Sequence, residues 1–233
     1  MTDTLTNPTT PVTREPASGT AVKARRLTAA ALVGGALLNG AESIGMRYLL
    51  PPKPEAAAAK LQMIADTGAR YPVLVTLGTL AVPLMCAGFL TLSRLVGRRA
   101  PRTGRAAAAL LLTGMFGFFG MHVLALAQVP LSRSADPAQA GALLDMVEKD
   151  ALLGVLFTAP FLAGCALGML VLVAGLLRTG ALPRWIPLTL LAFLVVDFGL
   201  GNGGPVDAHW LFVAACLGAA RAILTAGKTP AIG

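Results

Sequence analysis

The chain has 233 residues and a net charge of +8; 55% of its residues are hydrophobic and only 13% are charged. A soluble domain carries about 25% charged residues, so about half of the usual charge is missing and much of the surface must face a lipid bilayer. The composition excludes a disordered chain, a disulfide-stapled secreted module and a coiled coil, because these need polar excess, dense cysteine and heptad charges respectively. We therefore expect one all-α membrane domain.

The N-terminal segment 1–22 is rich in threonine and proline and contains no apolar run. Such a composition cannot bury a core, so we expect a disordered cytoplasmic tail. The first apolar run starts only at Leu27, which is too late for the hydrophobic region of a secretory signal. We predict that the membrane domain extends over 23–226 and that 227–233 form a second cytoplasmic tail.

Six apolar stretches are candidates for membrane spans, each of which takes about 20 residues as a helix. They lie at 27–50, 71–93, 106–128, 151–177, 185–200 and 206–225. Two connecting segments carry helical patterns of their own: 54–69, which starts with a proline, and the segment after Asp136-Pro137, a typical helix cap. The sequence thus predicts a polytopic bundle of six spans with two short helices on its outer surface.

The basic residues indicate the orientation of the bundle, because cytoplasmic loops collect lysine and arginine. Thirteen of the 19 lie on the side of the N-terminal tail: Arg14, Lys23, Arg25, Arg26, Arg94, Arg98, Arg99, Arg102, Arg105, Arg178, Arg184, Arg221 and Lys228. Both termini are therefore predicted to be cytoplasmic. The same charges explain the basic pI without a nucleic-acid partner, which we do not expect.

A faint duplication links the first two hairpins of the chain. Residues 45–47 recur as 120–122, and 73–76 recur as 155–158. Parallel repeats of this kind are common in small polytopic proteins. Glycines spaced three or four apart in the third and fourth spans would let helices approach closely, either inside the bundle or between two copies in a homodimer.

The first span carries an ionisable residue, Glu42. A charge in mid-membrane costs at least about 2.5 to 3.5 kcal/mol, so such residues mark functional sites by default. Asn39, Ser43 and Met46 fall on the same side of the helix as Glu42. We expect this polar stripe to point into the bundle, where Glu42 is either a proton-transfer group or a structural partner of Arg47 or of a donor on another helix.

Further polar residues lie at the same predicted depth on other spans. Asp197 precedes a glycine-rich turn at 199–205, while His122 and His209 lie near the outer ends of the third and sixth spans. We expect these residues to converge on one outward-opening cavity, because polar groups facing lipid would be costly. Glu42, Asp197 and His122 are the catalytic candidates, and the binding candidates are Asn39, Arg47, Asn202, Asp207 and His209.

No cofactor is expected from the sequence. Cys86, Cys165 and Cys216 lie deep in different spans with no histidine at ligand spacing, so no metal site is predicted. The alternative is a haem held axially by His122 and His209.

One inner loop carries a resemblance to known proteins. The segment Leu176–Pro187, with its Pro-Arg-Trp entry into the next helix, resembles the inner loop of several uncharacterised six-helix bacterial integral membrane protein families. That resemblance implies a bacterial plasma-membrane location and no particular reaction. A looser likeness in layout is to small membrane-embedded cyclases of terpenoid pathways.

Two functions remain open at this point. In the first, the cavity binds a small or lipophilic molecule without chemistry, as a binder, exporter or accessory subunit, in contact with the bilayer and with a second copy of the chain. In the second, the site is an intramembrane acid/base enzyme, an isomerase, cyclase or hydrolase. Such an enzyme would act on a lipophilic substrate, with one protonated carboxyl group as general acid and a second carboxylate or a histidine in a different environment as base.

Overall fold

A computed structural model describes residues 19–201 and 206–226, and within these residues it is helical with no strand. Three long helices are α1 (Gly19–Leu49), α3 (Arg70–Gly97) and α4 (Pro101–Leu131). The fourth segment combines α6 (Ala151–Leu153), the π-helical turn η1 (Gly154–Thr158) and α7 (Ala159–Thr179). All four are apolar and long enough to cross a membrane, so the chain is a helical membrane bundle.

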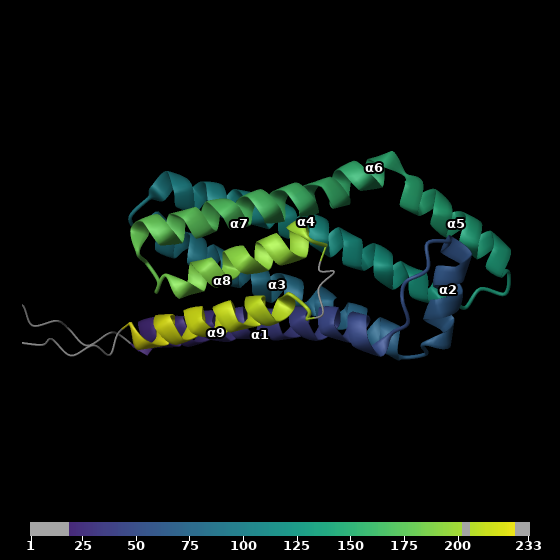
Figure 1. Cartoon of the computed structure of the whole chain (residues 1–233), viewed down its shortest axis with the longest axis horizontal. Helices are drawn as coiled ribbons and strands as arrows, with labels where there is room; N and C mark the ends of the chain where they lie inside the picture. Colours follow the sequence, from purple (N-terminus) through teal and green to yellow (C-terminus); the bar gives the residue numbers. More distant parts are fainter. Residues whose placement is uncertain (1–18, 202–205, 227–233) are drawn as a thin grey trace, which may run out of the picture.

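Two shorter apolar helices complete the bundle. α8 (Trp185–Leu194) continues into the π-helical turn η2 (Val195–Gly199), and α9 (His209–Thr225) follows. At a rise of 1.5 Å per residue they reach about 23 and 26 Å, less than the about 30 Å of a bilayer core. In Figure 1 the joined ends of these helices stop partway along the bundle, while α1 and α4 continue beyond them.

The apolar helices form a closed ring. Each helix packs on the next in the order α1, α3, α4, α7, α8 and α9, and α9 packs on α1. The inward faces form one apolar core, in which Phe212, Leu111 and Leu172 are almost completely buried. A ring of this kind encloses a central space, which holds the pocket described below.

The glycine spacing seen in the sequence serves packing inside the ring. A Cβ on Gly114 of α4 would overlap Cys165 and the Gly164 backbone of α7, and a Cβ on Gly168 would overlap Leu111. These glycines therefore bring α4 and α7 together within one copy of the chain, which is the first of the two expectations for them.

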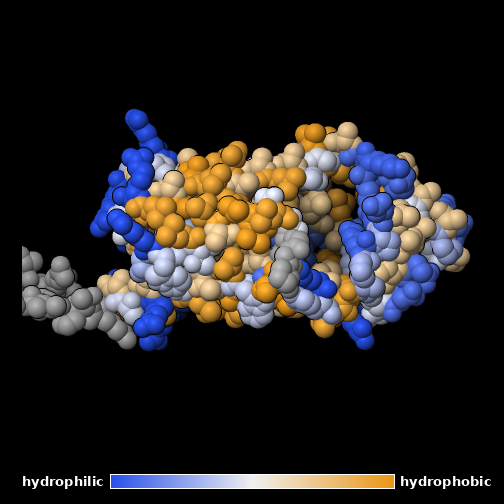
Figure 2. All heavy atoms as spheres, in the orientation of Figure 1, coloured by the Kyte–Doolittle hydropathy of each residue, from blue (hydrophilic) through white to orange (hydrophobic). Residues whose placement is uncertain are grey.

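Two short helices cover one end of the bundle, as predicted. α2 (Ala57–Asp66) and α5 (Pro137–Lys149) pack on each other through Ala57, Leu61, Ala140 and Leu144. The predicted cap at Asp136 is present, since its carboxylate accepts a hydrogen bond from the Gln139 N–H at 3.0 Å. Figure 2 shows hydrophilic side chains at both ends of the molecule and hydrophobic ones along the middle.

The order of elements repeats once along the chain. A long helix, a short outer helix and a second long helix occur as α1–α2–α3 and again as α4–α5–α7, and the long helices of each set pack together. This is the layout that two parallel hairpin repeats would produce.

Several helix boundaries differ from the sequence prediction. α1 begins at Gly19, four residues inside the predicted tail, α3 ends at Gly97 rather than at 93, and α4 begins at Pro101 rather than at 106. α9 begins at His209 rather than at 206. Gly19 and Thr225 lie at the same end of the bundle, together with the α3–α4 and α7–α8 connections (Figure 1). The remaining parts of the two predicted tails, 1–18 and 227–233, lie outside the described residues.

Candidate functional site

The first polar site is a pair formed by Glu42 of α1 and His122 of α4. Both carboxyl oxygens of Glu42 lie 2.9 Å from His122 Nε2, and His122 Nδ1 lies 2.9 Å from the Phe118 carbonyl oxygen. A carbonyl only accepts, so Nδ1 carries a proton and donates it. The pair then shares one further proton between His122 Nε2 and the Glu42 carboxylate. It is electrically neutral whether His122 or Glu42 carries this proton.

Gly78 of α3 makes this pair geometrically feasible. α3 lies between α1 and α4 in the ring, so a side chain at the crossing point would separate the two partners. A Cβ on Gly78 would overlap both the Glu42 carboxyl group and the His122 ring. The missing side chain therefore provides the space in which Glu42 and His122 meet.

The second polar site joins α1 to the start of α9. Ser43 donates a hydrogen bond to Asp207 Oδ2 at 3.0 Å, and the backbone N–H of His209 donates to Asp207 Oδ1 at 2.9 Å. His209 Nδ1 also lies 2.9 Å from Oδ1, and Asp207 is only 1% exposed. Glu42 and Ser43 are consecutive residues, so α1 directs two polar contacts to two different neighbours.

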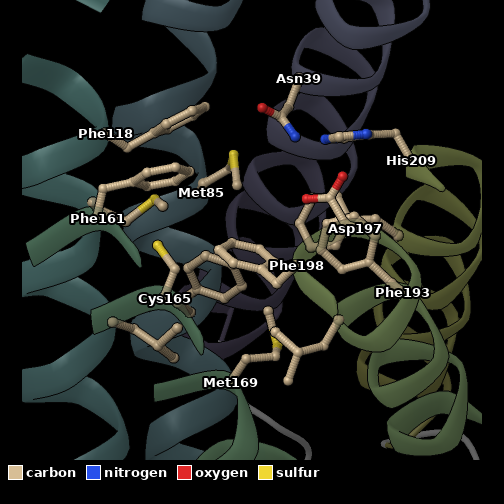
Figure 3. A pocket seen from close by; sticks show the side chains of 15 residues that line it. Asn39, Met85, Phe118, Phe161, Cys165, Met169, Phe193, Asp197, Phe198 and His209 are labelled. Carbon is tan, nitrogen blue, oxygen red and sulfur yellow. The ribbon is translucent and has the colours of Figure 1, made fainter. Parts of the chain in front are cut away.

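The third polar site is one end of a pocket inside the ring. The pocket is a cavity of about 60 Å³, and all six elements of the ring contribute lining residues. Asn39, Asp197 and His209 are the polar members of this lining. Figure 3 shows these three side chains gathered together, with Phe193 and Phe198 below Asp197. The pocket is therefore polar at one end and apolar elsewhere.

Aromatic rings form most of the apolar wall. Six of the nine phenylalanines of the chain line the pocket: Phe89, Phe118, Phe161, Phe193, Phe198 and Phe212. On one side the Phe161 ring lies between Phe118 and Phe198, with centroids 5.0 and 5.8 Å away. On the other side Phe193 contacts His209 and Phe212 at 5.3 and 5.1 Å. The wall continues to the first site, because Phe118 meets His122 edge-on at 4.3 Å.

Asp197 differs from the other two carboxylates in having no built-in partner. Within the described residues no hydrogen bond or ion pair reaches its oxygens; its charged neighbours are His209 and Asp207. Asp197 lies in η2, where Leu200 N bonds to Val195 O at 3.0 Å across a π turn. π turns inside α-helices are frequent at functional sites, and this one carries the unpartnered acid.

The predicted site residues thus separate into groups rather than one cavity. Asn39, Asp197 and His209 line the pocket, whereas Glu42 with His122 and Asp207 with Ser43 form polar links beside it. Both Glu42 oxygens contact His122, and the Arg47 guanidinium lies 5.5 Å from the centre of the Tyr48 ring. Asn202 lies outside the described residues.

The sequence analysis missed Gly78 and the phenylalanine wall. Gly78 is one of 26 glycines, and nothing in its neighbourhood marks it. The phenylalanine wall could have been predicted from the sequence, because most of the phenylalanines lie on spans that also carry a polar candidate residue.

In this structure both ring nitrogens of His122 have protein partners. A haem held axially by His122 would require one of these contacts to break, because an axial ligand needs a free ring nitrogen. Among the described residues no group of three or more His, Cys, Asp or Glu side chains could hold a metal ion.

These features define a helical membrane protein with a ring of apolar helices and an aromatic pocket that has one polar end. The chain belongs to a family of unknown function (DUF6796), whose model matches residues 53–199. The match starts after α1 and ends with η2, so it includes Gly78, His122 and Asp197 but not Glu42, Asp207 or His209. No curated protein and no solved structure matches the chain.

Proposed function

We propose that this protein binds a small lipophilic molecule in the central pocket, with the polar end of that molecule at Asn39, Asp197 and His209. The observation that carries the proposal is the lining itself: 12 of its 15 residues are apolar, and the three polar ones lie together. Ligand sites are typically apolar with a few convergent polar groups that fix orientation. A ligand would reach this pocket from the bilayer, with which the helices are in contact.

A binding role fits the geometry better than the acid/base role first considered for Glu42 and His122. A catalytic acid or base must come within hydrogen-bond reach of its substrate, yet Glu42 and His122 contact each other and are not among the lining residues. An intramembrane enzyme would instead use Asp197 and His209, which line the pocket side by side (Figure 3). That is the second candidate function.

We place the bundle in the plasma membrane with six crossings and both termini in the cytoplasm. The basic residues support this orientation, because the α3–α4 and α7–α8 connections at the end nearest the termini carry Arg98, Arg99 and Arg184, and Arg102 lies in the first turn of α4. Reporter fusions test it: a fusion after Lys149 should report the outside, and one after Arg102 the cytoplasm. The reverse pattern would overturn the orientation.

The binding proposal is tested by identifying the molecules that copurify with the protein from native membranes. We expect mass spectrometry to find a lipophile on the wild type, and to find it lost in Met169→Trp, which fills the lower part of the pocket (Figure 3). The control is Leu167→Trp, two residues away on α7 but 52% exposed on the outer face. Wild type without a lipophile, or equal retention by both variants, would contradict the proposal.

A further inference from the structure

We propose that the ligand of the central pocket is a lipophilic organic cation, a quaternary ammonium or protonated amine whose charged centre sits against Asp197. This inference rests on the proposed binding function and names its ligand class.

The charge balance singles out Asp197. Glu42 has His122, and Asp207 has Ser43 and two donors of His209, so both of these carboxylates are compensated by the fold. Of the three carboxylates, Asp197 is the one that lines the pocket, and it receives no hydrogen bond or ion pair from the described residues. An uncompensated charge in a membrane span is costly, and a bound cation would compensate it.

The pocket wall favours an organic cation. Aromatic rings attract a cation over their faces through the ring quadrupole, and recognition of quaternary ammonium groups is the best-known use of this interaction. Phe198 follows Asp197 directly in η2, and the Phe193 ring lies below the Asp197 carboxylate in Figure 3. The remaining phenylalanines and the methionines Met85, Met115 and Met169 would accept the apolar body of the ligand.

Inorganic cations and anions fit the same pocket poorly. Calcium takes six to eight oxygen ligands and magnesium near-octahedral oxygen coordination, but among the described residues only Asn39 and Asp197 bring side-chain oxygens to the lining. Anions would need a positive group, and no lysine or arginine of the described part of the chain lines the pocket. The Nδ1 atom of His209 is already engaged by Asp207.

The experiment compares benzyltrimethylammonium with neopentylbenzene, its uncharged carbon isostere. Binding is measured by equilibrium dialysis in an uncharged maltoside detergent, because the choline headgroups of a phosphatidylcholine membrane would compete. For the wild type we expect the cation to bind at least about tenfold more tightly than the isostere, since a desolvated cation–π contact and a charge pair both act only on the cation. The preference of the wild type for the cation over the isostere should weaken in acid, where the Asp197 carboxylate takes up a proton.

Asp197→Asn keeps the size of the side chain and removes its charge, so it should abolish the preference while leaving binding of the isostere unchanged. Unchanged isostere binding also shows that the variant is folded. Asp197→Glu should restore part of the preference. The matched control is Asp145→Asn on α5, an acid whose side chain is 49% exposed, which should leave the preference intact.

The outcomes separate the two proposals. Equal binding of both probes by the wild type, or a preference that survives in Asp197→Asn, would overturn the cation inference while the binding pocket stands. Failure of both probes to bind, together with no lipophile copurifying from native membranes, would overturn the pocket as well.

Discussion

Glu42 and Asp197 are both carboxylates in the apolar helices of the ring, but their surroundings differ. Glu42 meets a histidine from another helix across a gap made by a glycine, while Asp197 faces an empty, aromatic pocket. The first acid is satisfied by the protein itself and connects α1 to α4. For the second, we propose that a ligand supplies the partner. Polar residues of similar appearance in a membrane sequence can thus be structural in one place and ligand-directed in another.

The largest effect on stability is expected at Gly78, where Glu42 and His122 meet. Gly78→Ala places a methyl group on the Glu42 carboxyl and the His122 ring, so the pair must separate. We expect a loss of at least about 2 kcal/mol, because overpacking costs about 1 to 3 kcal/mol and each buried polar group left unsatisfied costs about 1 to 3 kcal/mol. Thermal unfolding in detergent, followed by circular dichroism, measures the loss.

The control for this substitution is Gly154→Ala, because a Cβ there meets nothing within 4 Å. It should be neutral or stabilising, since alanine is favoured over glycine in helices by about 1 kcal/mol. If Gly78→Ala melts at the same temperature as Gly154→Ala, Glu42 and His122 do not meet at Gly78.

Two double-mutant cycles would compare the coupling energy of Glu42 and His122 with that of Asp197 and His209. Glu42→Ala and His122→Ala should each cost about 2 to 3 kcal/mol, with a coupling energy of about 1.5 to 3, because either change leaves a buried polar partner unsatisfied. The same cycle on Asp197 and His209 should give a coupling under about 1 kcal/mol, since no hydrogen bond joins them among the described residues. Chemical unfolding in mixed micelles measures both.

Glu42→Gln refines this result. A glutamine N–H can donate to His122 Nε2 while Nδ1 keeps its bond to the Phe118 carbonyl. The loss should therefore be about 1 kcal/mol, and ligand binding should be unchanged. A large effect on ligand binding with little effect on stability would move Glu42 into the binding site and contradict its role as a structural link.

The smallest effect is expected at the outer ion pair between Lys60 and Glu148, whose side chains are 12% and 30% exposed. Lys60→Met should cost no more than about 1 kcal/mol and the cost should shrink in salt, because ion pairs near water are weak and screened. Lys149→Met, which removes the more exposed pair with Asp145, is the control and should change nothing measurable. A cost at Lys60 as large as that at Gly78 would mean that the depth of a pair in the bundle does not decide its strength.

The sequence was sufficient to predict the helices and not their contacts. Apolar runs and loop signals placed each long helix and both outer helices, because the bilayer demands long apolar segments and capping needs residues such as Asp136. The stripe of Asn39, Glu42 and Ser43 also pointed inward as predicted. Three neighbours on one helix nonetheless reach three different places, namely the pocket, His122 and Asp207. One helix face spans enough of its circumference to meet several neighbours, so pattern alone does not assign partners.

The pairing of Glu42 with His122 illustrates this limit. The sequence left the partner of Glu42 open between Arg47 on the same helix and a donor on another helix, and it did not single out His122, which is 80 residues away. A contact between distant residues depends on how helices pack, and here packing depends on a glycine on a third helix. Such a dependence leaves no trace in the periodicity of any single helix.

The π turn in η2 has a consequence for comparing relatives of this protein. A turn closed from residue i to i+5 holds one residue more than an α-helical turn, so the stretch Val195–Gly199 is one residue longer than a regular helix needs. A relative lacking one residue between Leu194 and Asp197 would have a regular α-helical turn here, and its acid would turn by about 100° around the axis. A one-residue gap at this place in an alignment would therefore change which way the acid points, even if the acid itself is kept.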